Sequence, residues 1–149
     1  MECIWPRIFS VYGIHEKETT MIASGLRKML AGEQTEFTPA MQRWDYLYSK
    51  DAGRAYYLIG EKGKDGEIYC VGSGQARPLK DYILKMAELT GAPEPGIGAR
   101  PYPKGAVMNL CADIESLNRD TGFVPEYTFE EGIKETIDWL KGQATGDTE

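Results

Sequence analysis

The sequence contains few histidines and cysteines, the residues that most often form metal sites and nucleophilic catalytic sites. His15 is the only histidine, so a zinc site or a Ser/His/Asp triad would depend on that one side chain. The three cysteines, Cys3, Cys70 and Cys111, lie in apolar surroundings and show no Cys-x-x-Cys spacing. We therefore interpret the cysteines as structural thiols of a reducing compartment and expect no metal site.

The charge balance limits the kinds of partner. A net charge of −6 argues against sequence-independent nucleic-acid binding, which needs a clustered Lys/Arg surface. A small phosphate-bearing ligand is compatible with that charge, because a local pair of arginines suffices to bind a phosphate. No apolar run approaches about 18 residues and no signal-like segment opens the chain, so we expect a cytoplasmic protein without a membrane span.

The spacing of apolar residues predicts a mixed α/β chain. Strands are expected at 2–9, 35–38, 44–48, 67–71 and 107–111. Helices are expected at 18–32, from Ser49 or Asp51 to about 61, at 78–90, from Asp113 to Gly122, and from Thr128 onward. The start of the last helix rests on the capping box Thr128-Phe-Glu-Glu131.

The first expected strand and the long loop at 92–106 each have a composition that limits their structure. Pro6 lies within the first expected strand, which must therefore be an edge strand or contain a bulge. An open strand edge at 2–9 would favour self-association, so a homo-oligomer is one expected state. Residues 92–106 are rich in proline and glycine, and loops of that length in compact domains are usually functional or disordered.

Four short segments follow one another with a recognisable order and spacing. They are Arg7-Ile-Phe-Ser-Val-Tyr-Gly13, Trp44-Asp-Tyr-Leu-Tyr-Ser-Lys-Asp51, Ile68-Tyr-Cys-Val-Gly-Ser-Gly74, and a closing stretch from Ala112-Asp113 through Asp120-Thr-Gly-Phe123 to Phe129-Glu-Glu-Gly-Ile133. Together they resemble the extended short-chain dehydrogenase/reductases, the family of NAD(P)-dependent epimerases, dehydratases and reductases of nucleotide sugars. Ile14 departs from the family pattern, in which proline is usual at that position.

The resemblance implies both a fold and a ligand. The fold is the α/β C-terminal substrate domain of such a protein, together with the last strands of its Rossmann sheet, over residues 1–142. Residues 143–149 are polar and are expected to form a disordered tail. The implied ligand is a nucleoside-diphosphate sugar, which an intact member binds beside NAD or NADP for epimerisation, dehydration or ketone reduction.

The same resemblance indicates what this chain lacks. Members hold the dinucleotide with a strand and a Gly-x-x-Gly-x-x-Gly segment that opens a helix, and use a Tyr-x-x-x-Lys pair on a helix as acid/base. We expect both segments to be absent, with Gly72–Gly74 too short to serve. Tyr46-Leu-Tyr-Ser-Lys50 has the second spacing, but Tyr46 falls in an expected strand and Lys50 at a helix start. We therefore expect no catalytic residue, no cofactor bound by this chain alone, and a cofactor domain upstream of Met1.

The resemblance implies which residues of this sequence occupy the ligand-binding positions of the family. Ser10 aligns with a family position that is often Asn and reaches the nucleotide sugar near the nicotinamide, and Phe9 lies beside it. Thr20 and Met21 open a helix under the base and sugar, where helix-start N–H groups suit a phosphate. Arg100 lies in the long loop, where the family often places an arginine against the diphosphate. The predicted sites are substrate-binding Ser10, Thr20, Met21, Trp44, Arg100 and Tyr102, and cofactor-binding Phe9 and Ser10.

Each of these positions has a structural alternative. Ser10 can simply close a strand, Thr20 can cap a helix, and Met21 is needed for the helix's buried face. Arg100 can be a solvated loop charge, and the aromatic side chains can be core residues.

Position 44 is the chief departure from the family pattern. Many members carry an arginine there that pairs with a phosphate, whereas this chain has Trp44, as a subset of the family does. Trp44 either stacks on a base or sugar or packs in the core. Asp45 and Asp51 are expected to be structural, and Gly72–Gly74 is expected to bring a strand end close to the ligand cleft.

A competing hypothesis is a non-catalytic binding module. Such a chain would pair with a separate cofactor domain or with itself.

Overall fold

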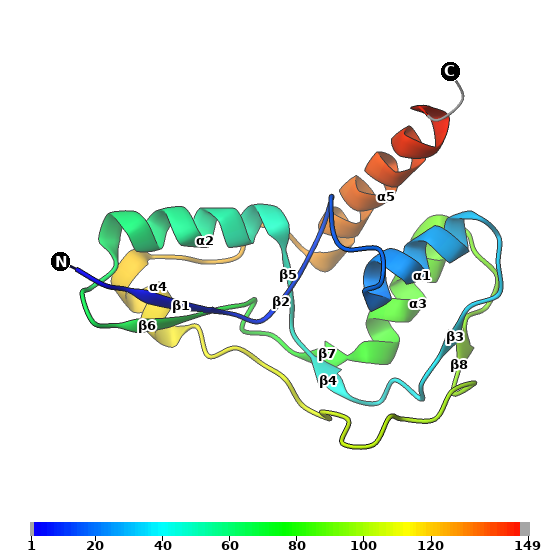
Figure 1. The fold of residues 1–149 in the computed structure, drawn as a ribbon, viewed down its shortest axis with the longest axis horizontal. Coiled ribbons are helices and arrows are strands. Elements are labelled where there is room, and N and C mark those ends of the chain that lie inside the picture. Colours follow the sequence, from blue (N-terminus) through cyan, green and yellow to red (C-terminus); the bar gives the residue numbers. More distant parts are fainter. Residues whose placement is uncertain (1, 147–149) are drawn as a thin grey trace.

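Helices and short paired strands alternate along the chain, as the predicted α/β class requires. The computed structural model describes residues 2–146 (Figure 1). The helices are α1 (Met21–Leu30), α2 (Ser49–Lys62), α3 (Leu79–Thr90), α4 (Glu115–Thr121) and α5 (Phe129–Gly146). The strands are β1 (Trp5–Ile8), β2 (Ser10–Tyr12), β3 (Glu36–Phe37), β4 (Arg43–Trp44), β5 (Tyr46–Tyr48), β6 (Ile68–Val71), β7 (Arg77–Pro78) and β8 (Gly96–Ile97).

The strands pair two by two, and segments far apart in the sequence form each pair. Pairs β1–β6, β2–β5 and β3–β8 are parallel, and pair β4–β7 is antiparallel. Strand β1 pairs on one side only, with Trp5 opposite Ile68 and Ile8 opposite Val71. Pro6 therefore lies in an edge strand, as its missing N–H requires.

Two apolar clusters stabilise the chain, and β5 contributes to both. One cluster joins α1, α3 and α5 through side chains that include Leu26, Met86 and Ile133. The other joins α2, β6 and α4, which lie at the opposite end of the molecule in Figure 1. Because successive strand residues point to opposite faces, Leu47 packs in the second cluster and Tyr48 in the first.

A buried carboxylate, Asp45, lies between β4 and β5. It accepts hydrogen bonds from the Ser73 N–H (2.9 Å), the Ser73 hydroxyl (2.6 Å), the Gly74 N–H (3.1 Å) and the Ala112 N–H (3.0 Å). Gly72 has no room for a side chain, since a Cβ there would lie 2.4 Å from the Ala112 Cβ. The expectation that Asp45 is structural is confirmed. The Gly72–Gly74 segment packs against Asp45 and Ala112, and its Ser73 lines a cavity, so the expected approach of this segment to a ligand stays a prediction.

Asp51 is also structural, but in a different role from the expected helix cap. Helix α2 begins at Ser49 with Tyr48 in the N-cap position and no side-chain cap. The Asp51 carboxylate instead accepts the N–H groups of Glu126 (3.0 Å) and Tyr127 (2.9 Å), which fixes the segment before α5.

The structure confirms the capping box and changes two other boundaries. The Glu131 N–H donates to Thr128 Oγ1 (3.2 Å), and the Thr128 N–H donates to Glu131 Oε2 (2.8 Å). Residues 107–111 form no regular strand, only an isolated bridge between Arg43 and Asn109. Helix α5 continues to Gly146, so residues 143–146 are helical where a disordered tail was expected, and 147–149 lie outside the described residues.

A second charged network ties α4 to β6. The Asp120 carboxylate accepts hydrogen bonds from Lys64 Nζ (2.7 Å), the Tyr69 hydroxyl (2.9 Å) and Arg119 Nε (2.9 Å). The hydrogen bonds from Arg119 and Lys64 lower the pKa of Asp120 well below its ordinary value. No helix within residues 2–146 is both long enough and apolar enough to cross a membrane.

Replacing Asp45 with asparagine tests the first network. Asp45→Asn substitutes an NH2 group for one of two acceptor oxygens that face N–H donors, and we expect the free energy of unfolding to fall by about 3 kcal/mol in urea titrations. Asp138→Asn, at an exposed position of α5, is the matched control and should change it by less than about 0.5 kcal/mol. Equal effects of the two substitutions would contradict the role assigned to Asp45.

The Asp120 network predicts a pH dependence. A carboxyl whose pKa is depressed in the folded state stabilises the fold above the unfolded pKa of about 3.9, and that contribution is lost as the pH falls toward the folded pKa. Asp120→Asn should therefore lower the urea midpoint at pH 7. The difference from the unsubstituted chain should shrink as the pH falls below about 4. A difference that stays constant down to pH 2 would exclude this electrostatic contribution.

Candidate ligand-binding site

A cavity of about 470 Å³ lies between α1, α3, β3, β4 and the loop that follows β8. Its walls are formed by Thr19, Met21, Ser24, Glu36, Phe37, Thr38, Gln42, Trp44, Tyr46, Leu79, Ile83, Arg100, Tyr102, Pro103, Ala106 and Val107. Most of these side chains are apolar or aromatic, with a few polar groups among them, as in small-molecule sites generally.

The cavity brings together four of the six predicted substrate-binding residues. Met21, Trp44, Arg100 and Tyr102 all line it, although they come from α1, β4 and the long loop. Ser10 is joined to this group because its hydroxyl accepts a hydrogen bond from Trp44 Nε1 at 2.8 Å. A ligand role for these residues stays a prediction, but their convergence on one space is a finding.

Thr20 and Phe9, the other predicted residues, do not line the cavity. Thr20 is the N-cap of α1, where its hydroxyl accepts the Ala23 N–H at 3.3 Å. Phe9 lies between β1 and β2, and its N–H donates to the Val71 carbonyl at 3.0 Å. Thr20 therefore has the alternative role foreseen for it, and its neighbour Thr19 lines the cavity instead.

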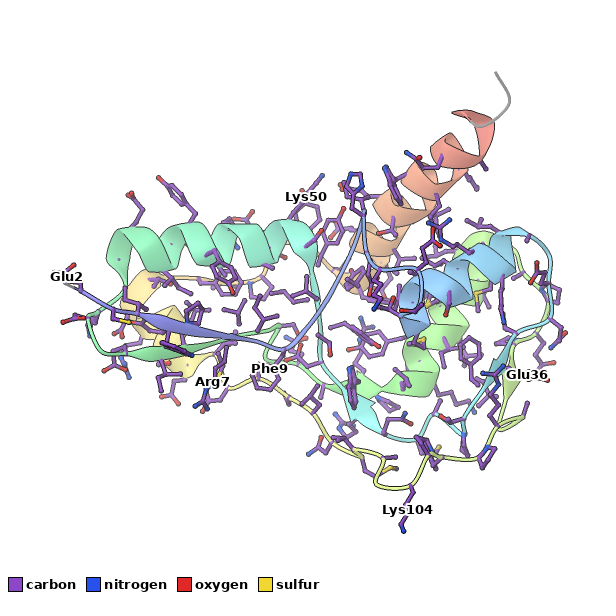
Figure 2. All side chains as sticks on the ribbon, viewed as in Figure 1. Glu2, Arg7, Phe9, Glu36, Lys50 and Lys104 are labelled. Atoms are coloured by element: carbon purple, nitrogen blue, oxygen red, sulfur yellow. The ribbon has the colours of Figure 1, made fainter. Side chains whose placement is uncertain are left out.

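Charged groups gather at the rim of the cavity. Arg100 Nε lies 3.2 Å from Glu36 Oε2, and both side chains are more than half exposed. Glu36 is the first residue of β3, and Figure 2 shows Lys104 projecting away from the molecule from the long loop, outside the residues that line the cavity. The Tyr102 hydroxyl accepts the Met41 N–H at 2.9 Å, which holds this loop against the segment before β4. At the rim, the long loop is thus fixed by the Tyr102 hydrogen bond, while the ion pair between Arg100 and Glu36 is exposed to solvent.

Sequence reasoning missed most of the wall residues, and three of them, Glu36, Gln42 and Tyr46, show why. Glu36 reaches the site only because β3 pairs with β8, which lies 60 residues later. Gln42 and Tyr46 flank Trp44 at a spacing of two, and alternation along an extended segment places them on the same face as Trp44. That alternation was a signal in the sequence that would have identified both.

The Tyr46/Lys50 spacing does not form an acid/base pair. Tyr46 lies in β5 and Lys50 in the first turn of α2, where its ammonium group is 2.6 Å from Glu135 Oε2. Figure 2 places Lys50 at the start of α2, on the side toward α5. Burial raises the pKa of Tyr46 far above its ordinary value, the opposite of what a proton-transferring tyrosine needs.

The expectation that Gly-x-x-Gly-x-x-Gly is absent was wrong as a statement about sequence. Gly60, Gly63 and Gly66 have this spacing, but they end α2 and precede β6, so the order is helix to strand. The Gly63 N–H donates to the Ile59 carbonyl (2.8 Å) and the Gly66 N–H to the Cys3 carbonyl (2.8 Å). Because these N–H groups are occupied, the glycines do not form the pyrophosphate cradle that NAD binding requires.

A second cavity, of about 400 Å³, lies beside Arg77 and the segment 124–130. Its chief cation is already paired, since Arg77 Nη1 lies 3.1 Å from Glu130 Oε1 and the guanidinium covers the Tyr82 ring. Within residues 2–146, no three His, Cys, Asp or Glu side chains gather as a metal site would require. The first cavity is the candidate ligand site, because four predicted substrate-binding residues line it and none lines the second.

Sequence comparison identifies relatives of the chain. Residues 1–72 match the model of the NAD dependent epimerase/dehydratase family. The dTDP-glucose 4,6-dehydratase of Shigella flexneri is 30% identical over 105 residues, which are 64% of this chain and 28% of that protein. The dTDP-glucose 4,6-dehydratase of Xanthomonas campestris pv. campestris is 28% identical over 138 residues, 86% of this chain and 39% of that protein.

Solved structures agree with these relatives. The UDP-glucose 4-epimerase of Thermotoga maritima, solved with UDP-glucose, has a TM-score of 0.89 at 27% identity and matches 97% of this chain and 47% of its own. MoeE5 in complex with UDP-glucose and NAD has a TM-score of 0.83 at 26% identity, over 95% of this chain and 48% of its own. The chain thus spans about half the length of these structures and less of the curated relatives. The chain is thus similar, in sequence over nearly half its length and in fold over almost all of it, to proteins of the NAD-dependent epimerase/dehydratase family.

Proposed function

We propose that this chain is the nucleotide-sugar-binding part of an NAD(P)-dependent epimerase/dehydratase. The observation that carries the proposal is the single cavity onto which Met21, Trp44, Arg100 and Tyr102 converge. The similarity to two proteins solved with UDP-glucose supports it, because that similarity extends over nearly the whole chain. The ligand class is therefore a nucleoside-diphosphate hexose.

Two features suit the diphosphate of such a ligand. Among residues 2–146, the Arg100 guanidinium pairs only with the exposed carboxylate of Glu36. Exposed ion pairs contribute little, so a diphosphate can displace Glu36 at small cost. Helix α1 directs its N-terminus toward the cavity, has no acidic residue in its first turn and places Met21 on the cavity wall. Arg100 supplies a planar guanidinium that pairs with two phosphate oxygens at once.

The cofactor NAD(P) is not expected to bind to this chain alone. When bound, the cofactor supplies hydride transfer, while the protein positions and orients the sugar. The described residues offer no free glycine cradle for its pyrophosphate, since Gly63 and Gly66 use their N–H groups internally. We therefore propose that this chain alone binds the nucleotide sugar and not the dinucleotide, and that Ser10 and Phe9 meet the cofactor only in a complete assembly.

One surface favours the alternative of a module that pairs with a partner. Strand β1 has an open edge, and on the β1–β6 pair Trp5 is 64%, Ile8 52% and Ile68 47% exposed. Exposed apolar patches beside an unpaired strand edge mark interaction sites. The partner is either a separate cofactor domain or a second copy of this chain.

Calorimetry of the chain with UDP-glucose and with NAD tests the main proposal. We expect binding of UDP-glucose and none of NAD. Arg100→Ala should weaken UDP-glucose binding about tenfold, because a charge-assisted contact to phosphate is lost. Lys28→Ala removes an exposed cation from the last turn of α1 and serves as the matched control, with unchanged affinity expected. Absence of UDP-glucose binding, or tight binding of NAD, would contradict the proposal.

Light scattering over a range of concentrations tests the pairing surface. The chain should self-associate as its concentration rises, and Ile8→Asp should reduce this because it places a charge in the apolar patch. Leu84→Asp changes another exposed apolar residue, on α3, and should leave association unaffected. A strictly monomeric chain would argue against a second copy and leave a separate domain as the partner.

A further inference from the structure

Three consecutive same-face residues form one wall of the candidate site. Gln42, Trp44 and Tyr46 all line the cavity, and they alternate with Arg43 and Asp45 along the extended segment that contains β4 and β5. Asp45 points the other way, into its own network of hydrogen bonds. One short segment thus presents an amide, an indole and a phenol, in that order, to the cavity.

The two outer members of this wall have unused hydrogen-bonding capacity. Gln42 Oε1 is buried and has no hydrogen-bond partner among the described residues. The Tyr46 hydroxyl bonds to no described residue either, whereas the hydroxyls of Tyr12, Tyr48 and Tyr82 each donate to a protein acceptor. Unlike Gln42 Oε1, it is not a buried atom without a partner, and Tyr46 also lines the second cavity. A buried polar group left unpaired costs free energy, and a ligand is one way in which it becomes satisfied.

The central member, Trp44, is held in a fixed orientation. Its Nε1–H donates to Ser10 Oγ at 2.8 Å, and its carbonyl accepts the Tyr82 hydroxyl at 2.9 Å. The indole therefore has its polar atom satisfied by the protein and offers only its aromatic surface to a ligand. An aromatic surface between two hydrogen-bonding groups suits a ring that has apolar C–H faces and a polar rim.

We propose that Gln42, Trp44 and Tyr46 form the subsite for the hexose ring of the nucleotide sugar. This inference rests on the proposed function and extends it from the ligand class to the part of the ligand held here. The hexose packs its C–H face on Trp44, and its hydroxyls donate to Gln42 Oε1 and accept from the Tyr46 hydroxyl. A sugar hydroxyl both donates and accepts, so it satisfies either group.

Other parts of the ligand fit this wall less well. An ionised phosphate has no proton to donate to Gln42 Oε1, so the diphosphate does not satisfy that atom. The base has a different aromatic surface available at the rim, where Phe37 and Tyr102 line the cavity near Arg100. The backbone N–H of Arg100 donates to the backbone carbonyl of Phe37 at 3.0 Å, which holds the long loop against β3 at that end of the cavity.

Calorimetry with UDP-glucose and with UDP tests the assignment. Tyr46→Phe removes one hydroxyl and keeps the ring, and Gln42→Met removes the amide at similar size. Each should weaken UDP-glucose binding about fivefold to tenfold, the effect of one buried hydrogen bond. Each should leave UDP binding unchanged. Tyr48→Phe removes a hydroxyl that donates to Glu135 outside the cavity, and it should alter neither affinity.

Tryptophan fluorescence gives an independent readout. UDP-glucose should quench the emission of the chain more than UDP does, and Trp44→Phe should abolish that difference, whereas Trp5→Phe and Trp139→Phe should retain it. The inference is overturned if the two wall variants weaken UDP and UDP-glucose equally, or if the unsubstituted chain binds both equally well. Those results would leave the nucleotide site intact, whereas binding of neither ligand would refute the proposed function itself.

Discussion

The carboxylate of Asp45 is the constraint on which the site depends. It is fully buried and accepts four hydrogen bonds, from the Gly-Ser-Gly segment after β6 and from Ala112. A buried charge is tolerated only when donors surround it, so those two segments cannot move independently of β4 and β5. Because Trp44 and Tyr46 are its immediate neighbours and point the other way, the network behind the strand fixes the wall of the cavity in front of it.

The predictable part of the fold is the part that local chemistry determines. The capping box at Thr128 and the Gly91 stop of α3 mark helix ends, and both agree with the structure. Residues 107–111 have an apolar sequence suited to a strand, but β structure depends on a partner, and only Asn109 finds one. Asp51 resembles a helix cap in sequence, yet its carboxylate bonds to residues 75 and 76 positions later, a contact that no local pattern encodes.

In the candidate site, too, residues in recognisable local segments were predictable, and residues that depend on long-range contacts were not. Family resemblance identified Met21, Trp44, Arg100 and Tyr102, which line one cavity, because those positions lie in or beside recognisable segments. Glu36 was missed because its ion pair with Arg100 joins residues 64 positions apart. The glycines at 60, 63 and 66 have the family's spacing and were overlooked, but a spacing alone does not make a phosphate cradle. Their N–H groups would have to open a helix after a strand, and here they close one.

The tryptophan at position 44 changes how recognition is divided within the site. An arginine there would place a charge in the middle of the cavity wall, next to the buried carboxylate of Asp45. With Trp44, the cationic groups that face the cavity lie at its exposed rim, where solvent screens them and ion pairs contribute little. If the proposed site binds a nucleotide sugar, discrimination between ligands falls to the half-buried wall, where the unpaired Gln42 Oε1 is costly and a matching hydroxyl would restore the lost hydrogen bond. Under the same proposal, a rim that attracts the diphosphate and a wall that selects the sugar both follow from this one substitution in the family pattern.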